Sequence, residues 1–196
     1  MRKAQVKRKT RETDIVVELN LYGSGQAKVK TGIAFFDHML TSLARHALLD
    51  LTLRAKGDLE VDQHHTVEDV GLVLGQALKE ALGDRRGIAR FGSAAAPMDD
   101  ALVLAAVDLG GRPYLEYEVM VVLKGQPVRD FDTQLIVEFF RALAQGAAMN
   151  LHVRQLAGRN RHHIIEAAFK ATALALREAV RKEPRARGVP STKGVI

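Results

Sequence analysis

The feature that most constrains this chain is a motif, His-His-x-x-Glu, that occurs twice in 196 residues. The copies begin at His64 and His162, and each follows a Gly-containing loop. The segments around them also match: Phe35-Phe36 is echoed by Phe139-Phe140, and Asp50-Leu51-Thr52-Leu53-Arg54 by Asn150-Leu151-His152-Val153-Arg154. Matching motifs in matching contexts predict an internal duplication, in which the two halves fold alike.

Hydrophobic periodicity and turn residues predict the order strand-strand-strand-helix-strand-helix in each half. In the first half, strands are expected at 3–10, 14–21, 26–30 and 49–56, and helices at 35–46 and 64–82. In the second half, strands are expected at 88–95, 101–109, 113–122 and 150–156, and helices at 132–148 and 162–182, the last ended by Pro184.

The predicted fold class is therefore α+β, an internal duplication of a βββαβα unit. Each unit is expected to form a mixed four-stranded sheet with helices on one face. We place the first repeat at 1–87 and the second at 88–196, and we expect the two repeats together to form one catalytic domain.

The composition is typical of a soluble globular protein, with 47% hydrophobic and 27% charged residues. No apolar run approaches the roughly 20 residues of a membrane span, and the basic N-terminus is not followed by an apolar secretory core. The chain has no Cys, which excludes disulfides and thiolate metal ligands. We therefore expect a cytoplasmic protein with no membrane partner.

The net charge of +6 raises the alternative of a basic RNA-binding fold, because basic surfaces gain affinity by neutralising phosphates. However, only 5% of the residues are aromatic, Trp is absent, and no zinc-finger or RNA-recognition motif is present. A basic enzyme with an anionic small-molecule substrate accounts for the charge equally well. We expect no nucleic-acid partner.

The spacing within the motif predicts how it binds metal. Residues four apart lie on one face of a helix, so the first His and the Glu of each copy can hold one ion. Adjacent residues point about 100° apart, so the second His cannot easily join the same ion. If the two copies face each other, each ion takes a His/Glu pair from one helix and the odd His from the other. The sequence thus predicts two ions and these ligands: His64, His65, Glu68, His162, His163 and Glu166.

His38 and His152 are the candidates for the remaining ligands. They do not align in the duplication, so the predicted symmetry covers the motif but not these outer ligands. Imidazole and carboxylate without thiolate suit manganese, iron, zinc or nickel. Asp69 could orient a ligand His from behind, or could be an exposed helix-surface residue.

Several basic residues could bind an anionic substrate. Lys170 follows Glu166 by one helical turn, Arg90 lies in an otherwise apolar segment, and Arg112 lies in a Gly-rich hairpin turn. The tail from Pro190 to Gly194 offers hydroxyls, backbone N–H groups and an ammonium group, which suit a phosphate. It is not a Walker motif, because the upstream Gly-rich loop is missing.

Short motifs form one ordered set along the whole chain: Arg8-Lys9-Thr10-Arg11-Glu12-Thr13, Phe36-Asp37-His38-Met39-Leu40, His46, Asp62-Gln63-His64-His65-Thr66-Val67-Glu68-Asp69, Arg90-Phe91, Pro97-Met98-Asp99-Asp100-Ala101, Gly111-Arg112-Pro113, Asn150-Leu151-His152, His162-His163-Ile164-Ile165-Glu166-Ala167, Phe169-Lys170-Ala171 and Ser191-Thr192-Lys193-Gly194. In this set the chain closely resembles the imidazoleglycerol-phosphate dehydratase family of histidine biosynthesis. We expect the chain to correspond to the catalytic domain of the family, without the fused phosphatase that some members carry.

The resemblance implies a hydro-lyase that converts D-erythro-1-(imidazol-4-yl)glycerol 3-phosphate to 3-(imidazol-4-yl)-2-oxopropyl phosphate, with two Mn²⁺ ions per active site. The substrate carbon that must lose a proton has no carbonyl or imine to acidify it, so direct elimination would be very slow. An imidazolate held between two ions can instead expel the adjacent hydroxyl to give a diazafulvene, which acidifies the neighbouring carbon. The ions then act as Lewis acids and as a template.

The resemblance also implies a role for each residue. The metal ligands would be His38, His64, His65, Glu68, His152, His162, His163 and Glu166. Glu12 would be the acid/base, with His46 as a proton relay. The phosphate would be bound by Arg90, Arg112, Ser191, Thr192 and Lys193, with Lys170 nearby.

The same resemblance implies a fold like the second domain of ribosomal protein S5. It further implies a homo-oligomer of twenty-four subunits, with active sites at subunit contacts. Two other functions stay open from the residues alone. A binuclear metallohydrolase normally uses more Asp, including a bridging carboxylate, and a non-catalytic metal-binding protein needs neither Glu12 nor the phosphate-binding tail.

Overall fold

The computed structural model describes residues 2–119, 127–185, 188–194 and 196. Its first half contains β1 (Lys3–Lys9), β2 (Thr13–Asn20), β3 (Ala27–Lys30), α1 (Ala34–Ala47), β4 (Asp50–Gly57) and α2 (His64–Leu82). Its second half contains β5 (Phe91–Met98), β6 (Ala101–Asp108), β7 (Tyr114–Glu118), α3 (Leu135–Ala147), β8 (Asn150–Ala157) and α4 (Arg161–Ala179). The predicted α+β class and the predicted order of elements are confirmed.

Each half forms one four-stranded sheet, and the two sheets have the same strand order, β1-β2-β4-β3 and β5-β6-β8-β7. In both sheets the first three neighbouring strands pair antiparallel, whereas β3 pairs with β4, and β7 with β8, in parallel. The predicted mixed sheets and internal duplication are therefore confirmed. The division at residues 87 and 88 stays a prediction.

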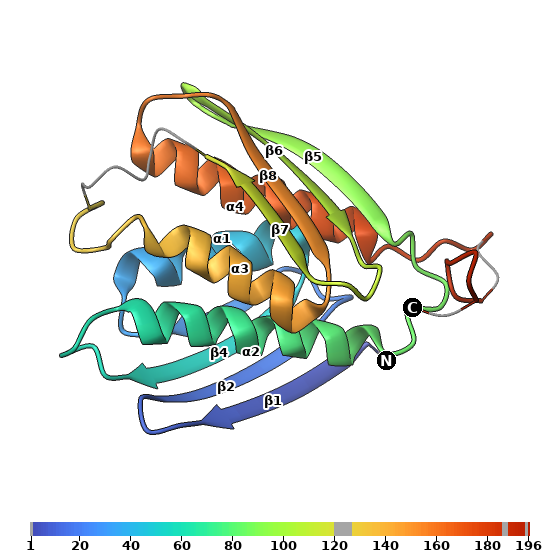
Figure 1. The fold of residues 1–196 in the computed structure, drawn as a ribbon, viewed down its shortest axis with the longest axis horizontal. Coiled ribbons are helices and arrows are strands. Elements are labelled where there is room, and N and C mark those ends of the chain that lie inside the picture. Colours follow the sequence, from blue (N-terminus) through green and yellow to red (C-terminus); the bar gives the residue numbers. More distant parts are fainter. Residues whose placement is uncertain (1, 120–126, 186–187, 195) are drawn as a thin grey trace.

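The four helices lie between the two sheets (Figure 1). Alternation in the strands directs apolar side chains inward, as in β2, where Ile15, Val17 and Leu19 are buried. The helices α1 and α2 cover the first sheet, and α3 and α4 cover the second. Between the halves, α2 packs on α3 and α1 packs on α4. Each helix therefore packs against a helix of the other half.

The α2–α3 contact is close enough for backbones to touch. A Cβ atom added at Gly146 would lie 2.3 Å from the Leu72 carbonyl oxygen, and one added at Gly75 would lie 2.5 Å from the Leu143 carbonyl oxygen. Only glycine leaves room for this approach. None of the helices in the described part of the chain has the length and apolar character needed to cross a membrane.

Two predicted boundaries are wrong for one shared reason. The strand β5 begins at Phe91 rather than 88, and α4 ends at Ala179 rather than 182. The residues just before β5 pair with the chain just after α4: Ile88 bridges Lys182, and the Arg90 N–H donates to the Ala179 carbonyl. Arg90 also has a positive φ of 72°, which is incompatible with a continuous strand.

Two further boundaries differ from the prediction. The helix α3 begins at Leu135 rather than 132, because Val128 and Phe131 form an antiparallel bridge and Asp132 accepts the Gln134 N–H in a turn. The strand β7 was expected over 113–122 and covers Tyr114–Glu118, and residues 120–122 lie outside the described residues.

Candidate metal centre and phosphate-binding residues

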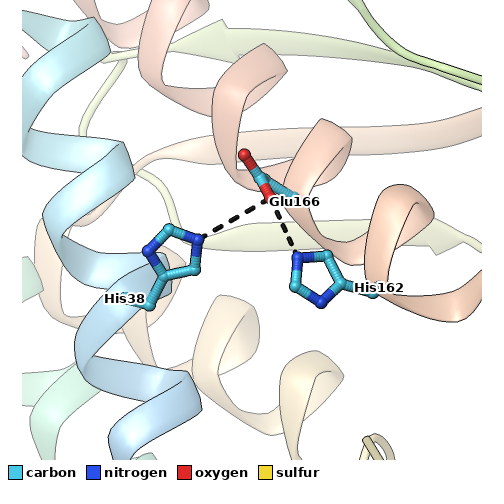
Figure 2. Close-up of side chains that lie close together, drawn as sticks. All are labelled: His38, His162 and Glu166. Carbon is cyan, nitrogen blue, oxygen red and sulfur yellow. Dashed lines mark hydrogen bonds and ion pairs between the residues drawn. The ribbon is translucent and has the colours of Figure 1, made fainter.

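Three ligand-type side chains from both halves converge at the N-terminal end of α4. His162 and Glu166 lie four residues apart on one face of α4, and His38 reaches them from α1. Their ligand atoms all lie within 4.8 Å of one another. Glu166 Oε2 is 3.1 Å from His162 Nε2 and 3.7 Å from His38 Nε2. Figure 2 shows both imidazole rings turned toward this carboxylate.

The buried carboxylate of Glu166 is held in its charged form. Burial alone would raise the pKa of Glu166, but a 2.8 Å ion pair with Lys170, together with His162 and His38, outweighs burial and lowers that pKa. The group is therefore an anion at neutral pH. Two imidazole nitrogens and one carboxylate oxygen form a donor set that suits a divalent transition-metal ion.

The first copy of the motif is more open. His64 Nε2 lies 3.6 Å from Glu68 Oε2, and about half of each side chain is exposed. The second His of each copy points elsewhere, as the helical spacing predicts. His65 Nδ1 lies 3.0 Å from Asp58 Oδ2, and His163 Nδ1 lies 2.7 Å from Asp100 Oδ1.

The two copies of the motif do not meet within one chain. Among the residues that the structure describes, the single converging group of three or more His, Asp or Glu ligand atoms is the one at Glu166. The expectation that the copies face each other is therefore wrong for an isolated chain. The reason is packing, because α2 packs against α3 while α4 packs against α1. The expected ligands outside the group are His64, His65, Glu68, His152 and His163.

His152 lies apart from the other expected ligands. It is exposed on the second sheet, where its ring centroid is 5.8 Å from that of Tyr114. It is the third residue of β8, and its strand partners are Ala106 and Glu116. This position is not part of the converging group.

The duplication indicates a further candidate ligand, Glu138, that the sequence reasoning missed. Both α1 and α3 end on a left-handed residue, Leu48 and Ala148, 100 positions apart. In that register Glu138 on α3 corresponds to His38 on α1. The echo between the two Phe-Phe pairs is consequently wrong, because Phe139 corresponds to Met39. Aligning the segments that begin at residues 50 and 150 with constant spacing could have found Glu138.

The predicted phosphate-binding residues gather at the opposite end of α4. Arg90 Nε and Nη2 donate to the Asp108 carboxylate at 2.7 and 3.1 Å, and Nη1 donates to the Pro190 carbonyl at 2.7 Å. The Arg112 carbonyl accepts the Asn150 amide at 2.7 Å. In the tail, the Lys193 N–H donates to Ser191 Oγ at 3.2 Å, and Thr192 lies between these residues.

The metal end and the phosphate end of one chain are far apart. His162 is in the first turn of α4, whereas the backbone of Arg90 bonds to Ala179, the last residue of α4. At about 1.5 Å per residue, these ends of the helix lie about 25 Å apart. Figure 1 shows the C-terminal segment beyond the C-terminal ends of α2 and α4. A small substrate cannot span this distance.

The two expected proton-transfer residues both lie toward the metal end. The backbone carbonyl of Glu12, in the β1–β2 hairpin, accepts the Asp58 N–H at 3.1 Å. The Asp58 hydrogen bond, followed by the nearby Glu12 charge, raises the pKa of His65. Burial, and then the Lys170 ammonium, lowers the pKa of His46.

Asp69 does not orient a ligand His. Its buried carboxylate pairs with Arg8 and accepts the Thr13 hydroxyl at 2.5 Å, which ties the start of the first sheet to α2. The carboxylates that contact the second His are Asp58 in the first motif, and Asp99 and Asp100 in the second. Backbone N–H donation from Arg159, and then the bond to His163, holds the pKa of Asp100 well below its usual range.

Comparison with protein families adds a separate line of evidence. The model of the imidazoleglycerol-phosphate dehydratase family matches residues 31–176. A protein of that name from Desulforamulus reducens is 56% identical over all of this chain and 98% of its own length. Another of that name, from Dinoroseobacter shibae, is 58% identical over all of both chains.

Solved structures agree with these relatives. The crystal structure of IGPD from Pyrococcus furiosus in complex with (S)-C348 superposes with a TM-score of 0.83. It is 42% identical and covers 97% of this chain and all of that one. The imidazoleglycerol-phosphate dehydratase structure from Staphylococcus aureus gives a TM-score of 0.82 at 36% identity, covering 92% of this chain and 99% of that one. The similarity therefore extends along nearly the whole fold, including both helices that carry the motif.

Proposed function

The chain belongs to the imidazoleglycerol-phosphate dehydratase family, and on this premise we propose that it eliminates water from imidazole glycerol phosphate with the help of two manganese ions. It is a dehydratase, that is, a hydro-lyase of histidine biosynthesis. The observation that carries the metal proposal is the convergence of His38, His162 and Glu166 in a chain that matches the family from end to end. The chain has no Cys that would tie it to an oxidising compartment, and we propose that it acts in the cytoplasm.

One ion would be held by His38, His162 and Glu166. By analogy with the duplicated positions, the second ion would be held by His64, Glu68 and Glu138. His65, His163 and His152 would complete the two sets from neighbouring chains. Bound there, divalent ions supply Lewis acidity for the imidazole ring of the substrate.

The chain's own residues then bind and orient the substrate. Arg90, Arg112, Ser191, Thr192 and Lys193 would hold its phosphate, and Glu12 would move the side-chain proton, with His46 as a relay. Fixing the remote phosphate contributes binding energy that orients the reacting end. Lys170 forms an ion pair with Glu166 and helps to lower the pKa of that carboxyl, so we propose that it acts on this metal ligand and not directly on the phosphate.

The direct test is activity combined with metal content. The assembled protein is expected to convert imidazole glycerol phosphate after loading with manganese, to lose this activity after chelation, and to regain it on adding manganese back. Elemental analysis at saturation is expected to give two ions per chain, because the proposal places one ligand set in each copy of the motif. One ion per chain with full activity would remove the second set from the proposal. Absence of conversion in the loaded protein would remove the proposed reaction itself.

We also propose that the protein is a homo-oligomer, in the family's form of twenty-four subunits, with active sites at subunit contacts. The support is the distance within α4, because a substrate held by the metal end of one chain needs the phosphate end of another. The outward face of the second sheet exposes Phe91, Leu104 and Tyr114, whereas that of the first carries charged side chains such as Lys7 and Glu18. An exposed apolar face of this kind is typical of a surface that is covered in an assembly.

Mixing two inactive variants tests the shared site. Glu166→Gln damages the metal end and Lys193→Ala damages the phosphate end, so each variant alone is expected to have little activity well below KM. If each site combines the two ends from different chains, random co-assembly restores about a quarter of the sites, because half of each end is intact.

The control for this experiment is a double variant that carries both substitutions in one chain, mixed with either single variant. In each of these mixtures every chain carries the same damaged end, either the metal end or the phosphate end. No site can then be complete, and no recovery is expected. No recovery in the mixture of the two single variants, although mass measurement shows mixed particles, would mean that the two ends do not meet between chains.

A further inference from the structure

Because the fold is duplicated, the surroundings of Arg90 can be compared with the equivalent corner of the first half. In each half an Arg precedes the first strand at this corner. Arg2 precedes β1 and Arg90 precedes β5. Their carbonyls accept the same contact, from the N–H of Leu21 and the N–H of Leu109 respectively. The two arginines therefore occupy equivalent positions in the fold.

The two corners differ by an exchange of Asn and Asp. In the first half Asn20 on β2 pairs across the sheet with Asp50 on β4. In the second half Asp108 on β6 pairs with Asn150 on β8. The carboxylate thus stands on the strand next to the Arg only in the second half.

The direction in which each guanidinium points correlates with this exchange of Asn and Asp. Arg2, whose neighbour Lys3 pairs with the neutral Asn20, turns to the end of α2 and donates to the carbonyls of Leu82 and Arg86. Arg90 turns instead onto the Asp108 carboxylate and reaches the tail at Pro190. A bidentate pairing of this kind fixes the plane of a guanidinium as well as its position.

The pairing leaves the guanidinium able to bind a ligand. A guanidinium carries five N–H donors, and the contacts with Asp108 and Pro190 use three of those on Arg90. One donor remains on each terminal nitrogen, the arrangement that matches two oxygens of a phosphate. About four fifths of each side chain in the pair is buried, which limits competition from solvent.

We propose that Asp108 is a positioning residue, which aims Arg90 at the substrate phosphate and, through Arg90 and the Pro190 carbonyl, places the Ser191–Lys193 tail beside it. This inference rests on the proposed phosphate role of Arg90. Asp108 itself repels an anion, so its contribution is orientation and not direct binding. The carboxylate of the first corner, Asp50, stands on the other strand of the pair, where it accepts the N–H groups of Ser24 and Gln26 and orders a loop.

Asp108→Asn gives the second corner the neutral residue that the first corner has. We expect the KM for imidazole glycerol phosphate and the inhibition constant of inorganic phosphate each to rise about tenfold, the low end for a charge-assisted contact. The kcat is expected to stay within about threefold, because the metal end is untouched. Asp50→Asn is the matched control, and it is expected to change neither phosphate constant. Both variants are compared with the wild-type protein after their assembly has been verified.

Asp108→Glu, which keeps the charge on a longer side chain, is expected to fall between wild type and Asp108→Asn, and it serves if Asp108→Asn does not assemble. Unchanged phosphate constants in an assembled Asp108 variant would overturn the proposal. Tighter phosphate binding would also overturn it, because Asp108 would then be a competitor for Arg90. Arg90→Met separates the phosphate role of Arg90 from the positioning role of Asp108. If Arg90→Met leaves the phosphate constants unchanged, the phosphate role of Arg90 fails. If Arg90→Met changes them and Asp108→Asn does not, only the positioning role of Asp108 is refuted.

Discussion

Glu166→Gln is expected to lower kcat/KM by about 10³-fold or more. The substitution keeps the size of the side chain but replaces a charged ligand with a neutral amide. A Lewis-acid ion contributes several kcal/mol to a transition state, and each 1.4 kcal/mol corresponds to about tenfold in rate. Elemental analysis of the assembled variant is expected to show loss of the ion at the centre of His38 and His162. The rate and the metal content are therefore measured on the same preparation.

A second effect of Glu166→Gln is expected without any metal. Glu166 is the buried anionic partner of Lys170, at 2.8 Å, so its neutralisation leaves an ammonium group without its partner. The metal-free protein is expected to lose about 1.5–3 kcal/mol of unfolding free energy, as for other hydrogen bonds to charged groups. Thermal or denaturant unfolding in the presence of a chelator measures this loss.

Glu68→Gln is the matched control, because Glu68 holds the same place in the first copy of the motif. Its side chain is about half exposed, and its contact with His64 is longer, at 3.6 Å. It is expected to lose metal and activity but to keep the stability of the metal-free protein. A Glu166→Gln protein that retains two ions per chain and normal turnover would exclude Glu166 as a ligand. Equal stability losses in both variants would contradict the role of the Lys170 pair.

Much of the fold was predictable because it depends on local patterns. Alternation defined strands such as β2, and the Gly after Leu82 marked the end of α2. The boundaries that were wrong depend on contacts distant in the sequence. Nothing local shows that the chain near Arg90 pairs with the end of α4, or that this pairing stops the helix at Ala179.

The candidate site was predictable to the extent that one helix builds it. The spacing of His162 and Glu166 gives their shared face directly, and it also explains why His163 points away. The position of His38 depends on how α1 packs on α4, which periodicity cannot reveal. Glu138 was missed because the equivalent residue in the first half is a His, His38. A search for the same residue type in both halves therefore does not find it.

The distance between the metal end and the phosphate end of one chain could not be predicted from motifs. A sequence motif carries no information on which end of a helix another motif will lie against. His162 and Arg90 were therefore assigned to one site, although about 25 Å of α4 separates their positions. In the proposed assembly a neighbouring copy would supply the missing end, so residues of one reaction can be spread along a single fold.

Glu12→Gln is expected to lower kcat by about 10²–10⁴-fold, the range for loss of a general acid/base. The Glu12 backbone carbonyl, which accepts the Asp58 N–H, is unchanged by the substitution, so the hairpin is expected to keep its place. Gln retains the size of the side chain but cannot take up a proton. Metal content, assembly and KM are therefore expected to remain near those of the wild-type protein, and the loss should be confined to turnover.

The matched control for Glu12→Gln is Asp14→Asn, two residues along the same hairpin, where the exposed carboxylate pairs with Lys9 at 2.9 Å. This change removes one negative charge from the same region but leaves Glu12 in place, and it is expected to leave kcat unchanged. Steady-state kinetics on both assembled, manganese-loaded variants gives the comparison. If Glu12→Gln turns over at a near-normal rate, Glu12 is not the proton-transfer residue, and the role passes to His46 or to a metal-bound water. His46 then becomes the residue to replace next, because its lowered pKa leaves it neutral and able to accept a proton at neutral pH.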